Sequence, residues 1–285
     1  MPTRRRRRVG RGVTANADVM IAGVSMGEIM ASSELEKVLS QTEHRPYPFP
    51  EGPWVLRMRW HDLLFMHWPV PEEWLRPLIP PALRLDTFDG SAWLGVVPFR
   101  MEDVRPRFLP GVPWLSNFPE LNLRTYVTHG GKPGLWFFSL DAHNPVAVRL
   151  ARATFGLPYF DAKMSYEVSD GEVRYRSVRT HKGAPPARFV GRYRPAGERF
   201  DSRPGTLENF LTERYCLYSA GVNGERRVRR GDIHHVVWPL QRAEAEVEEL
   251  EMTAQIRVSL PKTEPILHYA RRLDVVAWPP KRIDA

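Results

Sequence analysis

Polar side chains recur at every second position of residues 119–127. Side chains of a β-strand alternate between its two faces, so one face would carry Glu120, Asn122, Arg124 and Tyr126. An arginine can hold a substrate carboxylate with two parallel hydrogen bonds, and a glutamate can orient the substrate or exchange protons with it. The row therefore predicts either a polar ligand site inside a cavity or a solvated sheet face with a cross-strand ion pair.

The next expected strand, at residues 135–141, could contribute to the same site. Ser139 and Asp141 are two positions apart and therefore share a face of that strand. Asp141 could equally be a turn residue that precedes a helix cap at Asn144. We keep Ser139 and Asp141 as candidate ligand-binding residues, with the turn as the alternative for Asp141.

The histidines and the cysteine form no familiar metal or nucleophile motif. His61 and His67 lack a third ligand at a known spacing, and the adjacent His234 and His235 would point to opposite strand faces. The sequence has no His-Glu-x-x-His, Gly-x-Ser-x-Gly, P-loop or dinucleotide-binding glycine motif. We therefore expect no metal and no cofactor, and we expect Cys216 to be packed rather than reactive.

Composition predicts a β-rich protein without a membrane-spanning helix. The 285 residues include 9 tryptophans and 27 prolines; aromatic residues favour half-buried strands, and proline interrupts helices. No apolar run approaches the roughly 18 residues that cross a bilayer. The single cysteine excludes an internal disulfide and a cysteine-based zinc site, which fits a reducing compartment. We therefore expect a cytoplasmic protein, and the sequence leaves its homo-oligomeric state open.

Residues 1–33 differ in composition from the rest of the chain. Their six arginines against Asp18 and Glu28 give a net charge of +4, so residues 34–285 carry the remaining +4 of the total +8. We expect a disordered basic tail, or a start codon assigned too early. The alternative is a basic arm that contacts nucleic acid or acidic lipid, which the lack of interleaved aromatic residues disfavours. Residues 34–285 are expected to form a single domain.

Turn and cap residues divide that domain into strands with a few inserted helices. Two-residue hairpin turns are expected at Asp89-Gly90 and Asp170-Gly171, and Gly130-Gly131 is expected to lie in the turn between strands 121–128 and 135–141. Asn144 can cap a helix that ends at Gly156, and Thr206 can cap a shorter one. Further helices are expected at 72–78 and 243–254. Strands are expected at 54–68, 83–88, 92–101, 121–128, 135–141, 159–168, 172–180, 188–193, 215–220, 233–240 and 266–278. The pattern predicts an antiparallel barrel or sandwich with helical insertions.

Several stretches of this sequence resemble one bacterial family. They are PELNLRTYV at 119–127, LWFFSLD at 135–141, the segment 151–160 that ends in LPYF, and AKM at 162–164. These stretches resemble the YqjF-like family, which has no known function and is placed in the acetoacetate decarboxylase-like superfamily. The resemblance runs from about residue 53 to about residue 240. It implies a mainly β fold, an antiparallel barrel or cone with an interior cavity and a few inserted helices.

The same resemblance reveals a missing nucleophile. Decarboxylases of this superfamily form a Schiff base with a lysine that belongs to a pair directly after a Gly-x-Pro segment, and such a lysine needs a lowered pKa. Here Gly-Leu-Pro at 156–158 is followed by Tyr159 and Phe160, neither of which can form an imine. Lys163 is four positions after Tyr159, so a regular strand would place both on one face. We expect no classical decarboxylase activity; Lys163 is either a migrated nucleophile or a surface lysine.

The sequence supports three hypotheses about function. In the first, a small carboxylate or carbonyl compound binds in the cavity; the candidate residues are Glu120, Asn122, Arg124, Tyr126, Ser139, Asp141, Tyr159 and His61. The resemblance places a substrate-facing arginine of the decarboxylases near His61 and Arg59, which is why His61 is included. In the second, Lys163 forms an imine with a keto acid. In the third, the basic tail makes the protein an interaction module for nucleic acid.

Overall fold

A computed structural model of the chain describes residues 34–220 and 228–283. The strands are β1 (Leu56–Val70), β2 (Arg84–Leu85), β3 (Ala92–Pro106), β4 (Phe118–His129), β5 (Lys132–Ala142), β6 (Tyr159–Ser169), β7 (Glu172–Arg179), β8 (Arg188–Asp201), β9 (Cys216–Ser219), β10 (Arg229–His234), β11 (Pro239–Leu250), β12 (Ile266–Ala277) and β13 (Lys281–Arg282). The helices are α2 (Glu72–Leu75), α3 (Pro113–Ser116), α4 (Pro145–Phe155) and α5 (Leu207–Thr212), with 3-10 turns η1 (Arg76–Leu78) and η2 (Met252–Ile256). None of the described helices is long and apolar enough to cross a membrane.

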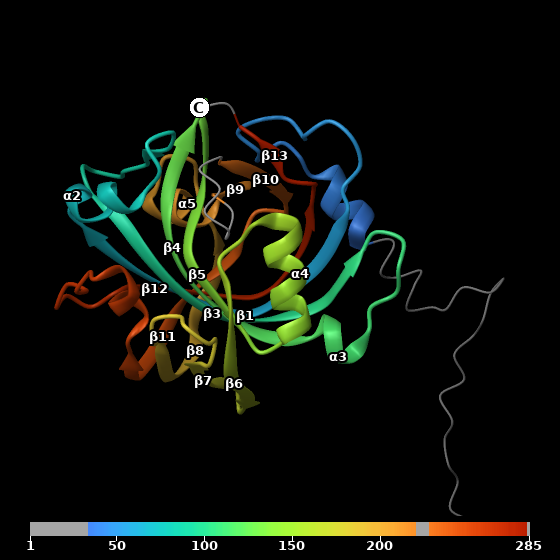
Figure 1. Ribbon diagram of the computed structural model, residues 1–285. Helices are drawn as coiled ribbons and strands as arrows, with labels where there is room; N and C mark the ends of the chain where they lie inside the picture. Colours follow the sequence, from blue (N-terminus) through green and yellow to red (C-terminus); the bar gives the residue numbers. More distant parts are fainter. Residues whose placement is uncertain (1–33, 221–227, 284–285) are drawn as a thin grey trace, which may run out of the picture.

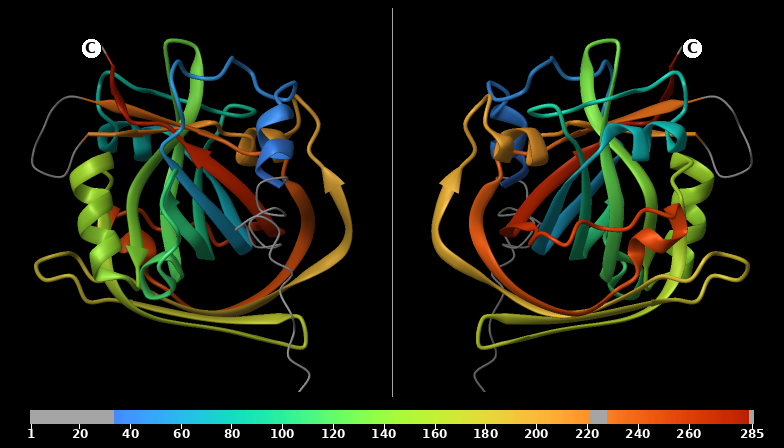
Figure 2. Two further views of the ribbon diagram at one scale, coloured as in Figure 1. Left: turned by 90° about the vertical axis from the view of Figure 1, so that its right-hand side faces the viewer. Right: turned by 90° about the vertical axis from the view of Figure 1, so that its left-hand side faces the viewer.

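The described strands form one curled sheet that closes on itself twice (Figures 1 and 2). A first ring runs from β5 through β4, β3, β1 and β12, and returns to β5 through β10 and β9. A second ring shares the path from β5 to β12 and returns through β11, β8, β7 and β6. We call the shared strands β5, β4, β3, β1 and β12 the common wall. It separates a first interior, inside the first ring, from a second interior, inside the second ring.

Side-chain alternation lets the common wall serve both interiors. In β1, Met58 and Phe65 pack in the hydrophobic core of the first interior, whereas Leu64 and Met66 pack in the core of the second. The change from even to odd positions is made at a bulge, where Asp62 has a positive φ of 50° and the register with β3 shifts. Both faces of the wall are therefore buried.

Most of the turn and cap predictions are confirmed. The Gly130-Gly131 and Asp170-Gly171 turns join the antiparallel pairs β4–β5 and β6–β7, with positive φ at all of their residues. Asn144 caps α4, because its Oδ1 accepts hydrogen bonds from the backbone N–H groups of Val146 and Ala147. Gly156 ends that helix in the left-handed region at a φ of 64°.

The hairpin expected around Asp89-Gly90 is only partly formed. The turn itself exists, because Phe88 and Ser91 exchange hydrogen bonds across it. The preceding strand β2 nevertheless pairs with β4 instead of β3. Both edges of β3 are already occupied, by β1 on one side and β4 on the other, so the chain before the turn has no free edge of β3 to join.

One other expectation about the elements was wrong. Residues 243–254 were expected to be helical because alanine and glutamate favour helices, but most of them belong to β11. There Ala243, Ala245 and Val247 pack in the second core, while Glu244 and Glu246 pair with arginines of β8. The expected mainly β fold with antiparallel pairing and a few inserted helices is confirmed; among the described strands, only β5 pairs in parallel, with β6 and with β9.

The contact between β5 and β9 gives a test of the fold. A Cβ atom on Gly134 would lie 2.6 Å from Cys216 Sγ and 2.7 Å from the Cys216 carbonyl oxygen. Because backbone cannot yield as a side chain can, Gly134→Ala should lower the free energy of unfolding by roughly 1–3 kcal/mol in urea titrations. The matched control is Gly231→Ala, whose new Cβ would meet the flexible end of Leu217 at 3.2 Å. Equal stability of the two variants would contradict this packing.

Candidate functional site

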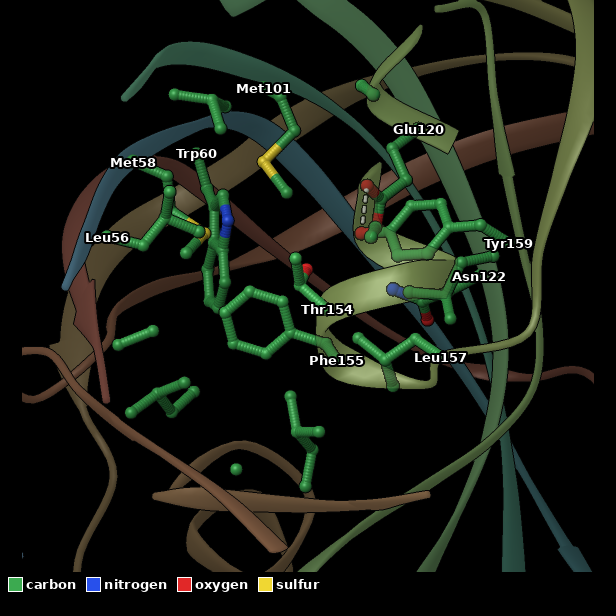
Figure 3. A pocket seen from close by; sticks show the side chains of 18 of the residues that line it. Leu56, Met58, Trp60, Met101, Glu120, Asn122, Thr154, Phe155, Leu157 and Tyr159 are labelled. Atoms are coloured by element: carbon green, nitrogen blue, oxygen red, sulfur yellow. Dashed lines mark hydrogen bonds between the residues drawn. The ribbon is translucent and has the colours of Figure 1, made fainter. Parts of the chain in front are cut away.

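The first interior contains a cavity of about 860 Å³. Strands β1, β3, β4 and β5 line it together with α4 and the segment around α3, two elements whose place beside the sheet can be followed in Figure 1. Apolar side chains dominate this wall. Figure 3 shows Met58, Trp60 and Met101 on one side and Glu120 with Tyr159 on the other. The cavity is thus an apolar chamber with a small polar region.

The polar row of β4 forms this polar region. Glu120, Asn122 and Arg124 all line the cavity, and each is almost completely buried. Leu121 and Leu123, which alternate with them, pack in the second core. Of the two alternatives for the row, a solvated face is therefore wrong, and the side chains lie in a cavity.

Glu120 is held in a protonated state at neutral pH. Burial raises the pKa of its carboxyl group from about 4.5 to about 8, and the Asp141 charge adds to the rise. The Tyr159 hydroxyl donates a hydrogen bond of 2.9 Å to Glu120 Oε2 and partly offsets the effect of burial on the pKa. The backbone of Glu120 is fixed from behind, because the Tyr175 hydroxyl in the second interior donates to its carbonyl oxygen at 2.7 Å. Glu120 can therefore donate a proton or a hydrogen bond into the cavity.

Arg124 is a buried cation that faces no carboxylate. Its Nη2 donates to the backbone oxygen of Leu211 at 3.3 Å, and the guanidinium lies 5.3 Å from the centre of the Phe65 ring. Among the described residues, no carboxylate is within ion-pair distance, and the buried Nε has no hydrogen-bond partner. Asn122 Oδ1 is likewise buried and has no partner in the described part of the chain. A donor and an acceptor therefore lie unpaired, among the described residues, just behind the cavity surface.

Tyr126 continues the row but lies beyond the cavity wall. Its hydroxyl donates to the carbonyl oxygen of Leu211 at 2.9 Å and is 2.7 Å from His67 Nε2. Burial and the nearby Arg124 lower the pKa of His67 well below its usual value, so neutral His67 donates to the hydroxyl. Tyr126 thus ties α5 to β4 behind Arg124.

The structure does not bring Ser139 and Asp141 to this site. They pair with Leu123 and Leu121 of β4, so they share the face that points to the second interior. Asp141 forms a buried ion pair with Arg179, with a shortest distance of 2.6 Å, and Ser139 Oγ accepts from Gln255 Nε2. The sequence showed that Ser139 and Asp141 share a face, but only the cross-strand register determines which one.

His61 and Arg59 lie on the side of β1 away from the cavity. Arg59 pairs with Asp274 and Glu102, and His61 Nε2 is 3.3 Å from a Glu102 oxygen. His61 and Arg59 therefore do not reach the cavity, whereas Trp60, between them in the sequence, does.

Tyr159 lines the cavity beside Glu120, but Lys163 does not. Lys163 keeps the strand face of Tyr159, since Ala162 and Met164 pack on the opposite face in the second core. The pairing of β6 with β5 ends at Asp161, however, and from Ala162 onward β6 pairs only with β7. Lys163 lies in this second part and is exposed. Among the residues that line the cavity in the described part of the chain, there is no lysine.

Several cavity residues were not anticipated from the sequence. Trp60 and Trp238 stack with ring centres 5.8 Å apart, and neither indole N–H has a partner among the described residues. Trp60 could have been found from the alternation of Leu56, Met58 and Trp60 in β1. His235 also lines the cavity, and burial lowers its pKa to about 4. Trp238 and His235 follow β10, and no local sequence pattern marks them.

The described residues show no candidate metal site, since no three His, Cys, Asp or Glu side chains are grouped to hold an ion. Among the described residues that line the cavity there is no glycine-rich phosphate loop. The arrangement can instead bind an anion at Arg124 and exchange a proton at Glu120.

The amino-acid sequence matches a known protein family. Residues 57–274 match the DUF2071 family model, described as an uncharacterized conserved protein. The chain is 46% identical over 230 residues to the uncharacterized protein YqjF of Bacillus subtilis (strain 168), covering 81% of this chain and 93% of YqjF.

Solved structures with the same fold are far more distant in sequence. Acetoacetate decarboxylase from Legionella pneumophila has a TM-score of 0.57 at 13% identity, covering 85% of this chain and 93% of the decarboxylase. The enduracididine biosynthesis enzyme MppR, solved with pyruvate, has a TM-score of 0.56 at 11% identity, covering 86% and 98%. At such identities the likeness shows the fold alone. The chain therefore belongs to the YqjF-containing DUF2071 family of uncharacterized conserved proteins, which has the acetoacetate decarboxylase-like fold.

Proposed function

We propose that the protein binds a small organic carboxylate, or a carboxylate that also carries a carbonyl group, in the cavity of the first interior without forming a Schiff base. One observation carries this proposal: Arg124 is buried at the cavity wall without a carboxylate partner in the described part of the chain. A ligand carboxylate would supply the missing charge through hydrogen bonds to the guanidinium.

The other buried arginines show how unusual Arg124 is. Arg179 is paired with Asp141 at 2.6 Å, and Arg214, also at the cavity, is paired with Asp86 at 2.5 Å. Arg45 also lacks a carboxylate among the described residues and has a buried nitrogen without a partner there, but unlike Arg124 it does not line the cavity. A buried charge without compensation destabilises a folded protein. Retaining one at a cavity wall is typical of a site whose counter-ion is the ligand.

Glu120 and Asn122 define the rest of the ligand. With its pKa near 8, Glu120 is neutral at pH 7 and can donate a hydrogen bond to an oxygen of the ligand at the other end of the polar row, about 13 Å along β4 from Arg124. Asn122 Oδ1 can accept a hydrogen bond from a hydroxyl or a hydrated carbonyl. Tyr159 orients Glu120 through its hydroxyl group.

Covalent catalysis through an imine finds no support in the cavity. The position after the Gly-Leu-Pro segment is Tyr159, whose phenol is hydrogen-bonded to Glu120, and the exposed Lys163 is outside the cavity. MppR has the same fold and was solved with pyruvate, which supports a keto acid as the first ligand to test. Residues 1–33, on which the nucleic-acid hypothesis depends, lie outside the described residues.

Replacing Arg124 tests the proposal directly. Arg124→Met removes a buried charge without a partner while keeping much of the side-chain volume, so the ligand-free protein should become more stable by at least about 1 kcal/mol. Affinity for 2-oxobutanoate, measured by isothermal titration calorimetry, should fall at least about thirtyfold, because a buried charge pair is broken.

The control for that variant is Arg179→Met, the same substitution at an arginine that forms a buried ion pair with Asp141. It leaves Asp141 buried and unpaired, so the free energy of unfolding should drop by roughly 3–5 kcal/mol. Destabilisation of both variants together with unchanged 2-oxobutanoate affinity in Arg124→Met would show that Arg124 is structural as well.

The raised pKa of Glu120 predicts how stability depends on pH. Glu120 has a pKa of about 8 in the folded protein and about 4.5 when exposed, so the unfolded chain loses this proton first as pH rises. Its contribution to stability is complete below pH 4.5 and is lost progressively up to about pH 8, by at most about 1.4 kcal/mol per pH unit. Glu120→Gln has no such loss. The variant should therefore gain stability relative to the wild type from pH 5 to 8 in urea titrations; a difference that is constant over this range would show that Glu120 is ionised.

Ligand binding should follow the same ionisation. Above pH 8 the Glu120 carboxylate adds a negative charge to the same cavity wall and no longer donates a hydrogen bond, and both changes disfavour an anionic ligand. Affinity for 2-oxobutanoate should therefore fall between pH 7 and 9 in the wild type, and calorimetry should show a flatter profile for Glu120→Gln. Identical profiles for the two proteins would place the ligand away from Glu120.

A further inference from the structure

The cavity is much larger than a three- or four-carbon keto acid requires. Its volume of about 860 Å³ is near the upper end of the roughly 300–1,000 Å³ typical of pockets that enclose drug-sized ligands. The polar groups that bind the carboxylate occupy one strand of its wall, β4. A small acid bound there would leave most of the apolar chamber unfilled.

The register of the strands orders the wall from a polar to an apolar end. Arg124 pairs with Gly95 of β3, whereas Phe118, six residues earlier, pairs with Met101. Met101 in turn pairs with Trp60 of β1. At about 3.3 Å per residue, this path along β4 spans roughly 20 Å. The cavity-facing residues of β4 along this path, Asn122 and Glu120, are polar. Val97, Phe99 and Met101 of the neighbouring strand β3 line the cavity beside them, so an apolar tail can run along β3 from a head at Arg124.

That path ends where apolar side chains reach the surface. Leu109 and Val112 precede or begin the α3 segment, and Leu150 lies in α4; all three line the cavity, yet they are 57%, 37% and 53% exposed. Exposed apolar residues gathered at one place on a protein mark a site that contacts another apolar group. Here they continue the inner wall of the cavity outward.

We infer that the ligand is amphipathic, a medium-chain carboxylate whose head is held at Arg124 and whose unbranched apolar tail runs past Phe99, Met101 and Trp60 toward Leu109. This inference rests on the proposed function and specifies its ligand class. The tail occupies the apolar chamber along β3 and points toward the exposed apolar side chains. A short keto acid binds the same head site but lacks the contacts along the wall.

The chain-length dependence of affinity tests the inference in the wild-type protein. Each methylene buried against an apolar wall strengthens binding roughly fourfold, which corresponds to about 0.8 kcal/mol. Titration calorimetry with 2-oxobutanoate, 2-oxohexanoate and 2-oxooctanoate should give a stepwise rise, on the order of 200-fold over the four added methylenes. Equal affinities for the three acids would overturn the inference while leaving the proposed head site intact. If none of the acids binds, the proposed function itself fails.

Two matched substitutions in α4 locate the tail. Ala151 lines the cavity, and Ala153, two residues further along the helix, is exposed and does not. Ala151→Phe should weaken binding of 2-oxooctanoate at least tenfold and leave 2-oxobutanoate affinity within about twofold, because it fills the apolar chamber but not the head site. Ala153→Phe should change neither.

Two results would contradict this placement of the tail. They are an equal loss of affinity for both acids in Ala151→Phe, and unchanged 2-oxooctanoate affinity in that variant. Far-ultraviolet circular dichroism and thermal melting of each variant confirm that it is folded. The chain-length series in the wild type does not depend on either variant.

Discussion

The common wall must satisfy two interiors at once, and this constraint determines the whole molecule. Its strands are buried on both faces along their central parts, so the residues at the centre of β4 point alternately into the first and the second interior. Leu121 and Leu123 fill the second interior, which leaves the alternate positions free to carry polar groups into the first. A one-residue slip of β4 would exchange these roles and bury Glu120 and Arg124 in a hydrophobic core. The register of β4 therefore specifies the site and the fold together.

Buried ionisable side chains have different partners on the two faces of the common wall. On the second side, Asp141 and Arg179 satisfy each other, and Gln255 adds a further hydrogen bond to Arg179. On the first side, the raised pKa of Glu120 leaves its carboxyl group protonated and neutral. Arg124 is charged and has no carboxylate partner among the described residues. A closed pair stabilises structure, and an open cation is available to a ligand. This contrast separates the structural polar residues from the functional ones more clearly than burial does, because all of them are buried.

Local signals in the sequence predicted the parts of this structure that depend on local contacts. The caps of α4 and the Asp170-Gly171 turn follow from the backbone preferences of a few residues. Alternation alone showed which residues of β4 share the polar face and left two alternatives for it, a cavity wall or a solvated surface. Facing could not be predicted for Ser139 and Asp141, because it depends on the pairing of β5 with β4. The strand β11 was mistaken for a helix because its alanines and glutamates have helix propensity; its strict alternation was the better signal, since burial against the second core outweighs propensity.

The hydrogen bond from Tyr175 to the Glu120 carbonyl oxygen has a consequence for how this family can diversify. The acid is anchored from the second interior, by a residue that no ligand in the first interior touches. Substitutions along the apolar wall of the cavity can then change the shape of the chamber while the proton remains in the same place. Substitutions of the apolar residues that line the cavity could thus change the ligand among descendants of one ancestral protein, while the Glu120 carboxyl group keeps its position.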